Sequence, residues 1–254
     1  MHSVTVDGMA KKVTAPRKPG LHFEKISVAE VAKKIGPGNA AKVRRNGMDD
    51  LTAEPGPRPR PRSSHFHGVQ FYNDPDALCR IVGSFVGEGL ERTDLALLIV
   101  TPDHAERIDR CLRARGTNLD DARRDGRLVT VDAEATLQLF MADGLPNPGA
   151  FRQTIGSVLT ELRRGRERCT VRAYGEMVDL LWKDGREAAA IRLETLWNQL
   201  AVTHDFDLLC GYSIGNFYKG AGIEDICNQH SHLLADTGDA TALPDRRAES
   251  AALL

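Results

Sequence analysis

The sequence lacks the glycine-rich loops with which many proteins bind the phosphates of nucleotides. Neither GxxxxGKS/T nor GxGxxG occurs in the 254 residues. Such loops need glycine so that backbone N–H groups can converge on the anion. ATP hydrolysis is therefore not expected. GxSxG occurs once, as GYSIG at 211–215, but no helix is predicted directly after it, as a nucleophile elbow requires. No Cys lies in a recognised nucleophile pattern. We expect a protein that is not an enzyme and that needs no cofactor.

Further absences concern the cellular setting. No apolar run reaches the roughly 18 residues that cross a bilayer. The first twelve residues, MHSVTVDGMAKK, have no apolar core of the kind found in secretory signals. The five cysteines include no CxxC pair, which favours reduced thiols over a disulfide framework. These features predict a cytoplasmic protein without membrane contact.

The near-neutral net charge of −1 hides an uneven distribution. Residues 1–65 carry thirteen Lys or Arg against six Asp or Glu, and EPGPRPRPRSS at 54–64 predicts a stiff, extended linker. A capping box of Ser27 and Glu30 predicts one short helix near 27–35. We expect a mostly flexible basic arm, either solvated or bound to an acidic surface. Because its basic residues lack interleaved aromatics, direct nucleic-acid binding is not expected. Residues 235–254 are expected to be a disordered tail.

Between these ends, residues 66–234 alternate strand and helix patterns. The apolar segments predict strands at 68–72, 95–101, 127–131, 169–174 and 206–212, with helices at 102–115, 133–141, 149–165 and 186–203 between them. Asn73-Asp74-Pro75 predicts a helix start after the first strand. This order predicts an α/β fold of three layers, in which helices cover both faces of a mostly parallel central sheet.

Ligands of such sheets bind at the carboxyl ends of the strands. We therefore predict a ligand site from polar side chains at or just after strand ends, where a few polar groups can converge in an apolar cleft. The predicted residues are Gln70, Tyr72, Thr101, His104, Asp132, Tyr174, Glu176, Cys210 and Tyr212. Gln70 has the weakest case, because it can face a helix instead.

Two junctions allow two interpretations each. The strand 95–101 runs into its helix through Thr101-Pro102-Asp103-His104, without glycine, so a small anion could bind at the helix N-terminus, or the residues simply start the helix. Glu176 follows Gly175 at the next junction. Its carboxylate could serve the helix dipole or lie in the ligand cleft with a shifted pKa.

A metal site is the third open question. Cys227, His230 and His232 have a spacing that resembles part of a zinc site. Because four ligands are needed and no second Cys/His pair is near in sequence, a terminal helix with one buried thiol is the alternative. HFH at 65–67 has the same ambiguity. Zinc is thus a cofactor that the sequence allows without predicting it.

Six segments follow one another in the order HGVQFYND, LALLIVTPDHAERIDRCLRARG, GRLVTVDAEATLQLFM, YGEMVDLLWKDGREAAAIRLETLWNQL, FDLLCGYSI and ICNQHSHLL. Together they resemble the MEDS family, the methanogen/methylotroph sensory domain named after a dichloromethane-responsive regulator. The resemblance covers about residues 66–234. It implies a RecA/KaiC-like fold that has lost its phosphate loop, and a sensor of small organic molecules such as halogenated hydrocarbon derivatives. The resemblance also implies a module of a kind that is typically joined to DNA-binding domains, histidine kinases or anti-sigma-type partners.

We therefore expect a sensory or regulatory protein of bacterial signal transduction or transcription control. It would bind a small organic ligand and pass the signal to a signalling protein by direct contact. The arm helix would bind that partner or cover the cleft until a ligand displaces it. A pure interaction regulator of a kinase or sigma-factor switch, with a vestigial cleft, is the alternative, and a metal-dependent enzyme is a more distant one. The sequence leaves homo-oligomerisation open.

Overall fold

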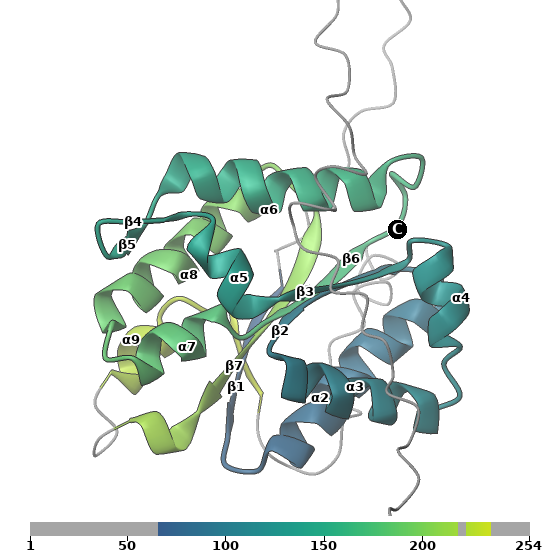
Figure 1. The fold of residues 1–254 in the computed structure, drawn as a ribbon, viewed down its shortest axis with the longest axis horizontal. Coiled ribbons are helices and arrows are strands. Elements are labelled where there is room, and N and C mark those ends of the chain that lie inside the picture. The colour runs from purple at the N-terminus through teal and green to yellow at the C-terminus, as the bar shows by residue number, and fades with distance from the viewer. Residues whose placement is uncertain (1–65, 218–221, 235–254) are drawn as a thin grey trace, which may run out of the picture.

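The computed structural model describes residues 66–217 and 222–234, and a six-stranded parallel sheet lies at its centre (Figure 1). The strand order is β3-β2-β6-β7-β1-β8, and every pair of neighbouring strands is parallel. The strands are β1 (His67–Tyr72), β2 (Leu95–Val100), β3 (Leu128–Asp132), β6 (Val171–Gly175), β7 (Phe206–Ser213) and β8 (His232–Leu234).

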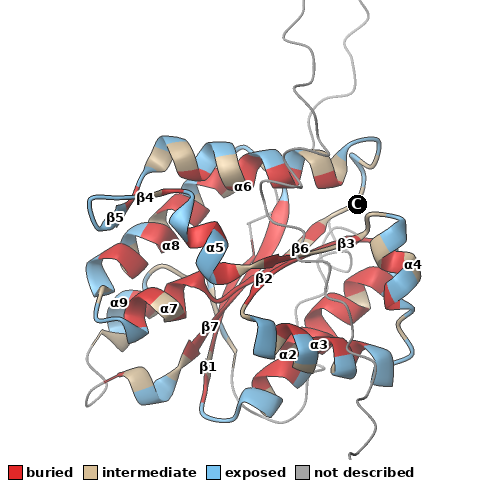
Figure 2. Cartoon of the chain, in the orientation of Figure 1, coloured by how far each residue is buried: buried red, intermediate tan, exposed pale blue. Residues whose placement is uncertain are grey.

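The central strands are buried on both faces. In β2, LALLIV, all six residues are buried, and the strands in Figure 2 are correspondingly red. Because successive side chains point to opposite faces, Leu97 and Ile99 enter one core while Leu98 and Val100 enter the other. A continuous apolar strand of this kind is stable only where helices cover both faces of the sheet.

Two helical layers provide this cover (Figure 1). One face packs against α2 (Pro75–Glu91), α3 (Pro102–Ala114) and α4 (Leu119–Arg124). The other packs against α5 (Ala133–Gln138), α6 (Pro148–Arg163), α7 (Met177–Lys183), α8 (Glu187–Ala201) and α9 (Ile223–Cys227). The predicted three-layer α/β fold with a parallel sheet is therefore confirmed, whereas the RecA/KaiC likeness stays a prediction.

Local sequence signals explain where the helices begin. The Asp74 side chain caps α2 by accepting from the backbone N–H groups of Asp76 and Ala77, and Pro75 takes the first helical position. This confirms the start predicted from Asn73-Asp74-Pro75. Asn147 caps α6 in the same way.

The predicted helix at 133–141 ends earlier than expected. α5 stops at Gln138, and β4 (Met141–Ala142) then pairs antiparallel with β5 (Leu145–Pro146). Asp143 and Gly144 form the turn with φ values of 49° and 82°. Asp-Gly is a typical pair for such a turn, because both residues tolerate positive φ. The helix α4 and the strand β8 were also not predicted from the sequence.

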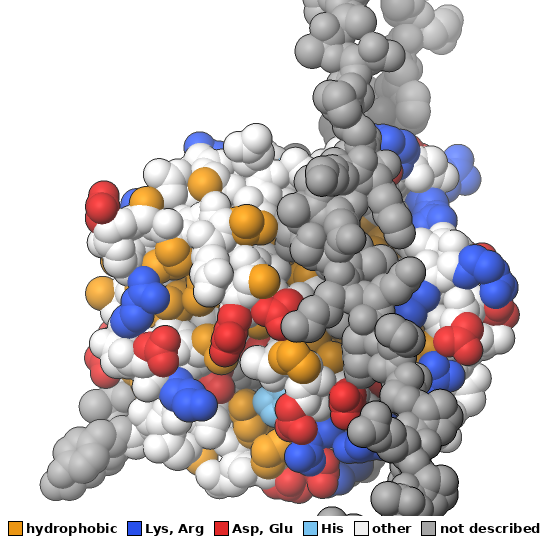
Figure 3. All heavy atoms as spheres, in the orientation of Figure 1, with side chains coloured by type: hydrophobic (Ala, Val, Ile, Leu, Met, Phe, Trp, Pro, Cys, Tyr) orange, Lys and Arg blue, Asp and Glu red, His pale blue; other side chains and the backbone are white. Residues whose placement is uncertain are grey.

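The basic arm, its helix near 27–35 and the tail at 235–254 lie outside the described residues. On the face in Figure 3, basic and acidic side chains of the described part lie next to one another over α2 and α3. Between these two helices, Arg107 of α3 pairs with both Asp76 of α2 and Asp103 of α3. In the described ranges, none of the helices is long and apolar enough to cross a membrane.

Candidate functional site

The structure divides the nine predicted ligand residues among three places. Asp132 lies apart and caps α5, with its side chain accepting from the backbone N–H of Ala135 at 2.8 Å. Cys210 and Tyr212 point to the face of the sheet that α8 covers. The remaining six lie at the carboxyl ends of β1, β2 and β6 or on the face toward α2 and α3. They are Gln70, Tyr72, Thr101, His104, Tyr174 and Glu176.

Glu176 connects the carboxyl ends of β6 and β2. It follows the last residue of β6 and is only 3 % exposed. One carboxylate oxygen accepts from the backbone N–H of Thr101, the residue that precedes α3. The other lies 2.5 Å from Nδ1 of His104 in the first turn of α3. This hydrogen bond raises the pKa of His104 above its ordinary value, against the lowering effect of burial.

This arrangement answers the question that the glycine-free junction raised. The N-terminus of a helix attracts an anion through its free N–H groups and its dipole. At α3 that place is taken by the protein's own carboxylate, from Glu176. Both interpretations of Glu176 therefore hold in part. The side chain is buried at the predicted edge, and it serves a helix dipole, that of α3 rather than that of α7.

Asp179, which the sequence analysis missed, forms a second network beside the first. It is 8 % exposed and accepts from the backbone N–H of Ser213 at 3.0 Å, from the Asn216 amide at 3.0 Å and from the Tyr72 hydroxyl at 3.3 Å. Burial raises the pKa of Asp179 above its usual value, although these donors oppose the shift. A carboxylate one turn after Glu176 in an otherwise apolar helix was the available signal.

Tyr174 and Gln70 carry buried polar atoms that find no partner in the described residues. The Tyr174 side chain is 0 % exposed, and its hydroxyl makes no hydrogen bond there. Gln70 is 1 % exposed, and its Oε1 is likewise without a partner, whereas its amide donates to the Phe71 carbonyl at 2.8 Å. Burial raises the pKa of Tyr174 well above its usual value, so the hydroxyl stays protonated and can donate.

The two side chains lie on the same face of the sheet, on the strands on either side of β7. Gln70 in β1 stands opposite Gly211 in β7. A Cβ atom at Gly211 would lie 2.6 Å from the Tyr174 hydroxyl oxygen, so this hydroxyl lies directly over Gly211. The ring of Tyr72 continues the same face and meets the ring of His104 edge-on at 6.1 Å between centroids.

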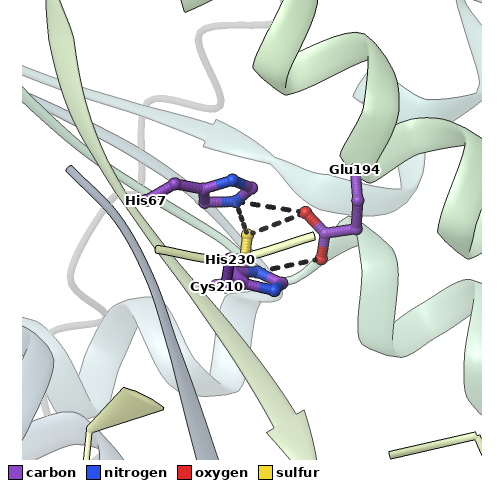
Figure 4. A group of neighbouring side chains, drawn as sticks. All are labelled: His67, Glu194, Cys210 and His230. Carbon is purple, nitrogen blue, oxygen red and sulfur yellow. Dashed lines mark hydrogen bonds and ion pairs between the residues drawn. The ribbon is translucent and has the colours of Figure 1, made fainter. Parts of the chain in front are cut away.

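A second group of polar side chains lies on the opposite face of the sheet (Figure 4). His67 of β1, Glu194 of α8, Cys210 of β7 and His230, between α9 and β8, each direct one donor atom to a common centre. The four side chains are 0 or 1 % exposed. Tyr212 lies beside them and donates its hydroxyl to Glu194 Oε1 at 2.7 Å.

Charge is concentrated in this buried group. Burial alone would raise the pKa of Glu194, but the contacts with His230 and His67 outweigh it and hold the pKa well below the usual range. Burial would lower the pKa of His230, whereas Glu194 raises it above the ordinary value. Burial raises the pKa of the Cys210 thiol well above its usual value. The protein thus keeps a carboxylate inside its core.

Of the three residues suggested for zinc by spacing, the structure brings only His230 into this group of potential ligands, as judged over the described residues. Cys227 ends α9, and His232 begins β8, where its ring contacts Phe66. His67 comes from the ambiguous HFH segment, and Glu194 was not singled out. A carboxylate among the buried apolar positions of α8 was the signal that could have found it.

Comparison with known families gives a match that covers most of the described residues. The model of the MEDS family, described as the methanogen/methylotroph, DcmR sensory domain, matches residues 66–231. The matched range contains both polar groups, from His67 to His230. Among curated proteins, no match to the chain is found.

Proposed function

The chain belongs to the MEDS family of sensory domains, and from this membership we propose that it senses a small organic molecule at the carboxyl edge of its sheet. The signal would pass to a signalling protein by direct contact, and no reaction would be catalysed. The sensory or regulatory role follows from the family. The ligand, its position and the partner are the parts that we add.

The observation that carries the ligand site is the pair of buried atoms without partners, the Tyr174 hydroxyl and Gln70 Oε1. A buried polar group without a hydrogen bond costs about 1–3 kcal/mol. A ligand group that donates to Gln70 Oε1 and accepts from Tyr174 would recover that energy. The apolar cluster to which Tyr174 belongs suits a small molecule with one polar group and an apolar remainder.

The networks at this edge supply a route for the signal. Glu176 links the end of β6 to the start of α3 through Thr101 and His104. Asp179 links α7 to Ser213, at the end of β7. A ligand beside Tyr72, which bonds Asp179 and packs on His104, would bias both networks at once. We expect α3 and α7 to shift in response and so to change the surface offered to the partner.

Thermal unfolding of the full chain with a panel of one- and two-carbon halides, alcohols and amines tests this proposal. A ligand that binds only the native state at 100 times its Kd stabilises by about 2.7 kcal/mol, so the melting temperature should rise for at least one compound class. Tyr174→Phe should remove that rise. Tyr212→Phe, which deletes an equally buried hydroxyl on the other face, should keep it. A rise that survives in Tyr174→Phe would refute the site.

A second candidate function also has an observation in its favour. Glu176 and Asp179 already have protein donors for their carboxylates, so the charges at this edge need no ligand. A protein-interaction regulator with a vestigial cleft would have carboxylates that are satisfied by the protein itself in this way. It predicts that no compound of the panel shifts the melting temperature, and that a protein partner binds the wild type and Tyr174→Phe equally.

A further inference from the structure

We propose that His67, Glu194, Cys210 and His230 bind one Zn²⁺ ion in the core of the domain (Figure 4). The four side chains come from four separate segments of the chain, yet their donor atoms all lie within 4.8 Å of one another. Two imidazole nitrogens, a carboxylate oxygen and a thiolate sulfur are the donor types that zinc takes in tetrahedral sites. The proposal is independent of ligand sensing at the carboxyl edge.

Three of the six distances between the donors match the edges of a tetrahedron around zinc, and the four donors as a set lie within 4.8 Å of one another. Bonds of about 2.0–2.3 Å to zinc place neighbouring donors about 3.3–3.6 Å apart. His67 Nε2 lies 3.2 Å from Glu194 Oε2 and 3.5 Å from Cys210 Sγ, and that sulfur lies 3.5 Å from Glu194 Oε2. His230 Nε2 lies 3.4 Å from Oε1, the other oxygen of the Glu194 carboxylate, so a modest rotation of this carboxylate or ring would complete the site. Charge-assisted N–H···O bonds are shorter, about 2.7–2.9 Å.

His230 gives a second, independent indication. Its side chain is 1 % exposed, and its Nε2 faces Glu194 Oε1 at 3.4 Å without forming a hydrogen bond of good geometry. The other ring nitrogen, Nδ1, lies 2.7 Å from the carbonyl oxygen of Ile226. A carbonyl only accepts, so Nδ1 carries the proton, and the lone pair of neutral His230 is left on Nε2, directed at the common centre.

The tautomer of His67 is fixed in the same way. The Asn198 amide donates from Nδ2 to the carbonyl of Gln229 at 2.9 Å, which leaves its Oδ1 facing His67 Nδ1 at 2.9 Å. His67 therefore donates from Nδ1 and offers Nε2 inward. Histidines that bind metals commonly donate their second ring N–H to such an oxygen, which orients the ring. Tyr212 plays the equivalent part for Glu194 by donating to Oε1.

Charge provides the third argument. A carboxylate and a thiolate together carry two negative charges, which one Zn²⁺ neutralises with both histidines uncharged. Without a metal, the buried Glu194 carboxylate needs a protonated imidazole beside it, and the two rings stand only 4.1 Å apart between centroids. Buried charges are retained in proteins where they are paired or bind metals. In the neutral form each imidazole directs a nitrogen lone pair toward the carboxylate, which repels it. A metal ion between them turns this repulsion into coordination by all three groups.

The donor set also defines the kind of site. Nitrogen and sulfur ligands exclude the hard cations Ca²⁺ and Mg²⁺, which take oxygen. Four protein ligands leave no open position for a substrate, which is the arrangement of structural zinc rather than catalytic zinc. His230 is the one ligand that comes from the segment between α9 and β8, so zinc would fasten this segment to β1, β7 and α8. This role differs from that of the metal-dependent enzyme considered from the sequence.

The test begins with the full chain, purified without a metal-binding tag. Elemental analysis and native mass spectrometry should find about one zinc per chain, and competition with a chromogenic chelator gives its affinity. Cys210→Ser and His230→Gln should each weaken zinc binding by about 100-fold or more. Cys79→Ser, which alters a buried cysteine on the other sheet face, and His232→Gln should bind zinc as the wild type does.

Cobalt keeps the test decisive if a ligand variant fails to fold. Co²⁺ bound to the wild-type protein should show the strong visible bands of a tetrahedral ion and a thiolate-to-cobalt band in the near ultraviolet. Both should be present in Cys79→Ser and His232→Gln. The proposal is overturned if the folded wild type takes up no zinc at equimolar concentration, or if its cobalt spectrum shows no thiolate ligand. It is equally overturned if a folded Cys210→Ser chain binds zinc with unchanged affinity.

Discussion

His104 and Glu176 form an ion pair between the first turn of α3 and the residue that precedes α7, with Nδ1 of the imidazole 2.5 Å from Oε2 of the carboxylate. The second carboxylate oxygen accepts from the backbone N–H of Thr101. The pair is largely shielded from water, since the two side chains are 13 % and 4 % exposed. It therefore holds the start of α3 to the sheet edge with a strength that depends on the charge of the imidazole.

The first prediction concerns pH. The bond to Glu176 raises the pKa of His104 above its ordinary value, so the pair stabilises the fold fully below the unfolded-state pKa of about 6.5. The stabilisation is lost as pH rises through the raised folded-state pKa. His104→Gln should lower the free energy of unfolding by about 1.5–3 kcal/mol near the acidic end of that range, and by less in alkaline solution.

Urea denaturation of the wild type and His104→Gln over a pH series measures this difference. His204→Gln is the matched control, because the His204 ring contacts the hydroxyls of Thr160 and Thr203 rather than a carboxylate. Its effect on stability should not follow the same pH course. A difference between wild type and His104→Gln that stays constant with pH would contradict the role assigned to the pair.

The second prediction compares two buried hydroxyls. Tyr174 and Tyr212 are both 0 % exposed, but only Tyr212 has a bonded hydroxyl, at 2.7 Å from Glu194 Oε1. Without added ligand, Tyr212→Phe should destabilise by about 1.5–3 kcal/mol, whereas Tyr174→Phe should leave stability unchanged or raise it by up to about 1 kcal/mol. Chemical denaturation of the two variants decides, and a large loss in Tyr174→Phe would mean that its hydroxyl has a partner.

The third prediction tests the position of the Tyr174 hydroxyl over Gly211. A Cβ atom at residue 211 would lie 2.6 Å from that oxygen and 3.3 Å from the nearest ring carbons. Gly211→Ala should therefore destabilise by about 1–3 kcal/mol through overpacking. The same change in a Tyr174→Phe background should cost clearly less, because the closest atom is gone. A double-mutant cycle measures this coupling, and additive effects of the two changes would place the hydroxyl elsewhere.

The fold was readable from the sequence because its signals are local. Alternating strand and helix patterns gave the three layers, and Asp74 and Asp132 gave helix starts that the structure shows. The hairpin of β4 and β5 was missed although Asp143-Gly144 is a typical turn pair. Strands of two residues are too short for a periodic pattern to appear.

The sequence predicted which polar residues lie at the strand ends, but not which face of the sheet each one takes. The reason is that the central strands are buried on both faces. In β7 every residue except Ser213 is buried, so no alternation of apolar and polar residues marks which face is which. Cys210 and Tyr212 share a face because they are two residues apart. However, no local sequence signal indicates that Glu194 of α8 packs against that face. His67 and His230 lie near opposite ends of the domain sequence, yet their rings are in contact. Spacing along the chain cannot predict such a contact.

The last prediction follows from the proposed zinc site and concerns its removal. Of the four ligands, His230 alone belongs to the C-terminal segment 223–234, and β8 at its end pairs through three residues with β1. Because a metal that binds only the native state stabilises it by mass action, a chelator should lower the melting temperature of the zinc-loaded protein. The loss of order should be greatest in this segment.

Hydrogen exchange read by mass spectrometry locates the effect. Chelation should speed amide exchange in 223–234 far more than in β2, which lies between β3 and β6 and is buried on both faces. His230→Gln should show the faster exchange without chelator and should no longer respond to it, whereas Cys79→Ser should respond as the wild type does. A uniform rise across the domain would mean that the metal supports the whole fold rather than this segment. Unchanged exchange in 223–234 would mean that His230 does not fasten the segment, because the other three ligands lie in β1, β7 and α8, which the sheet and its helices hold in place with or without a metal.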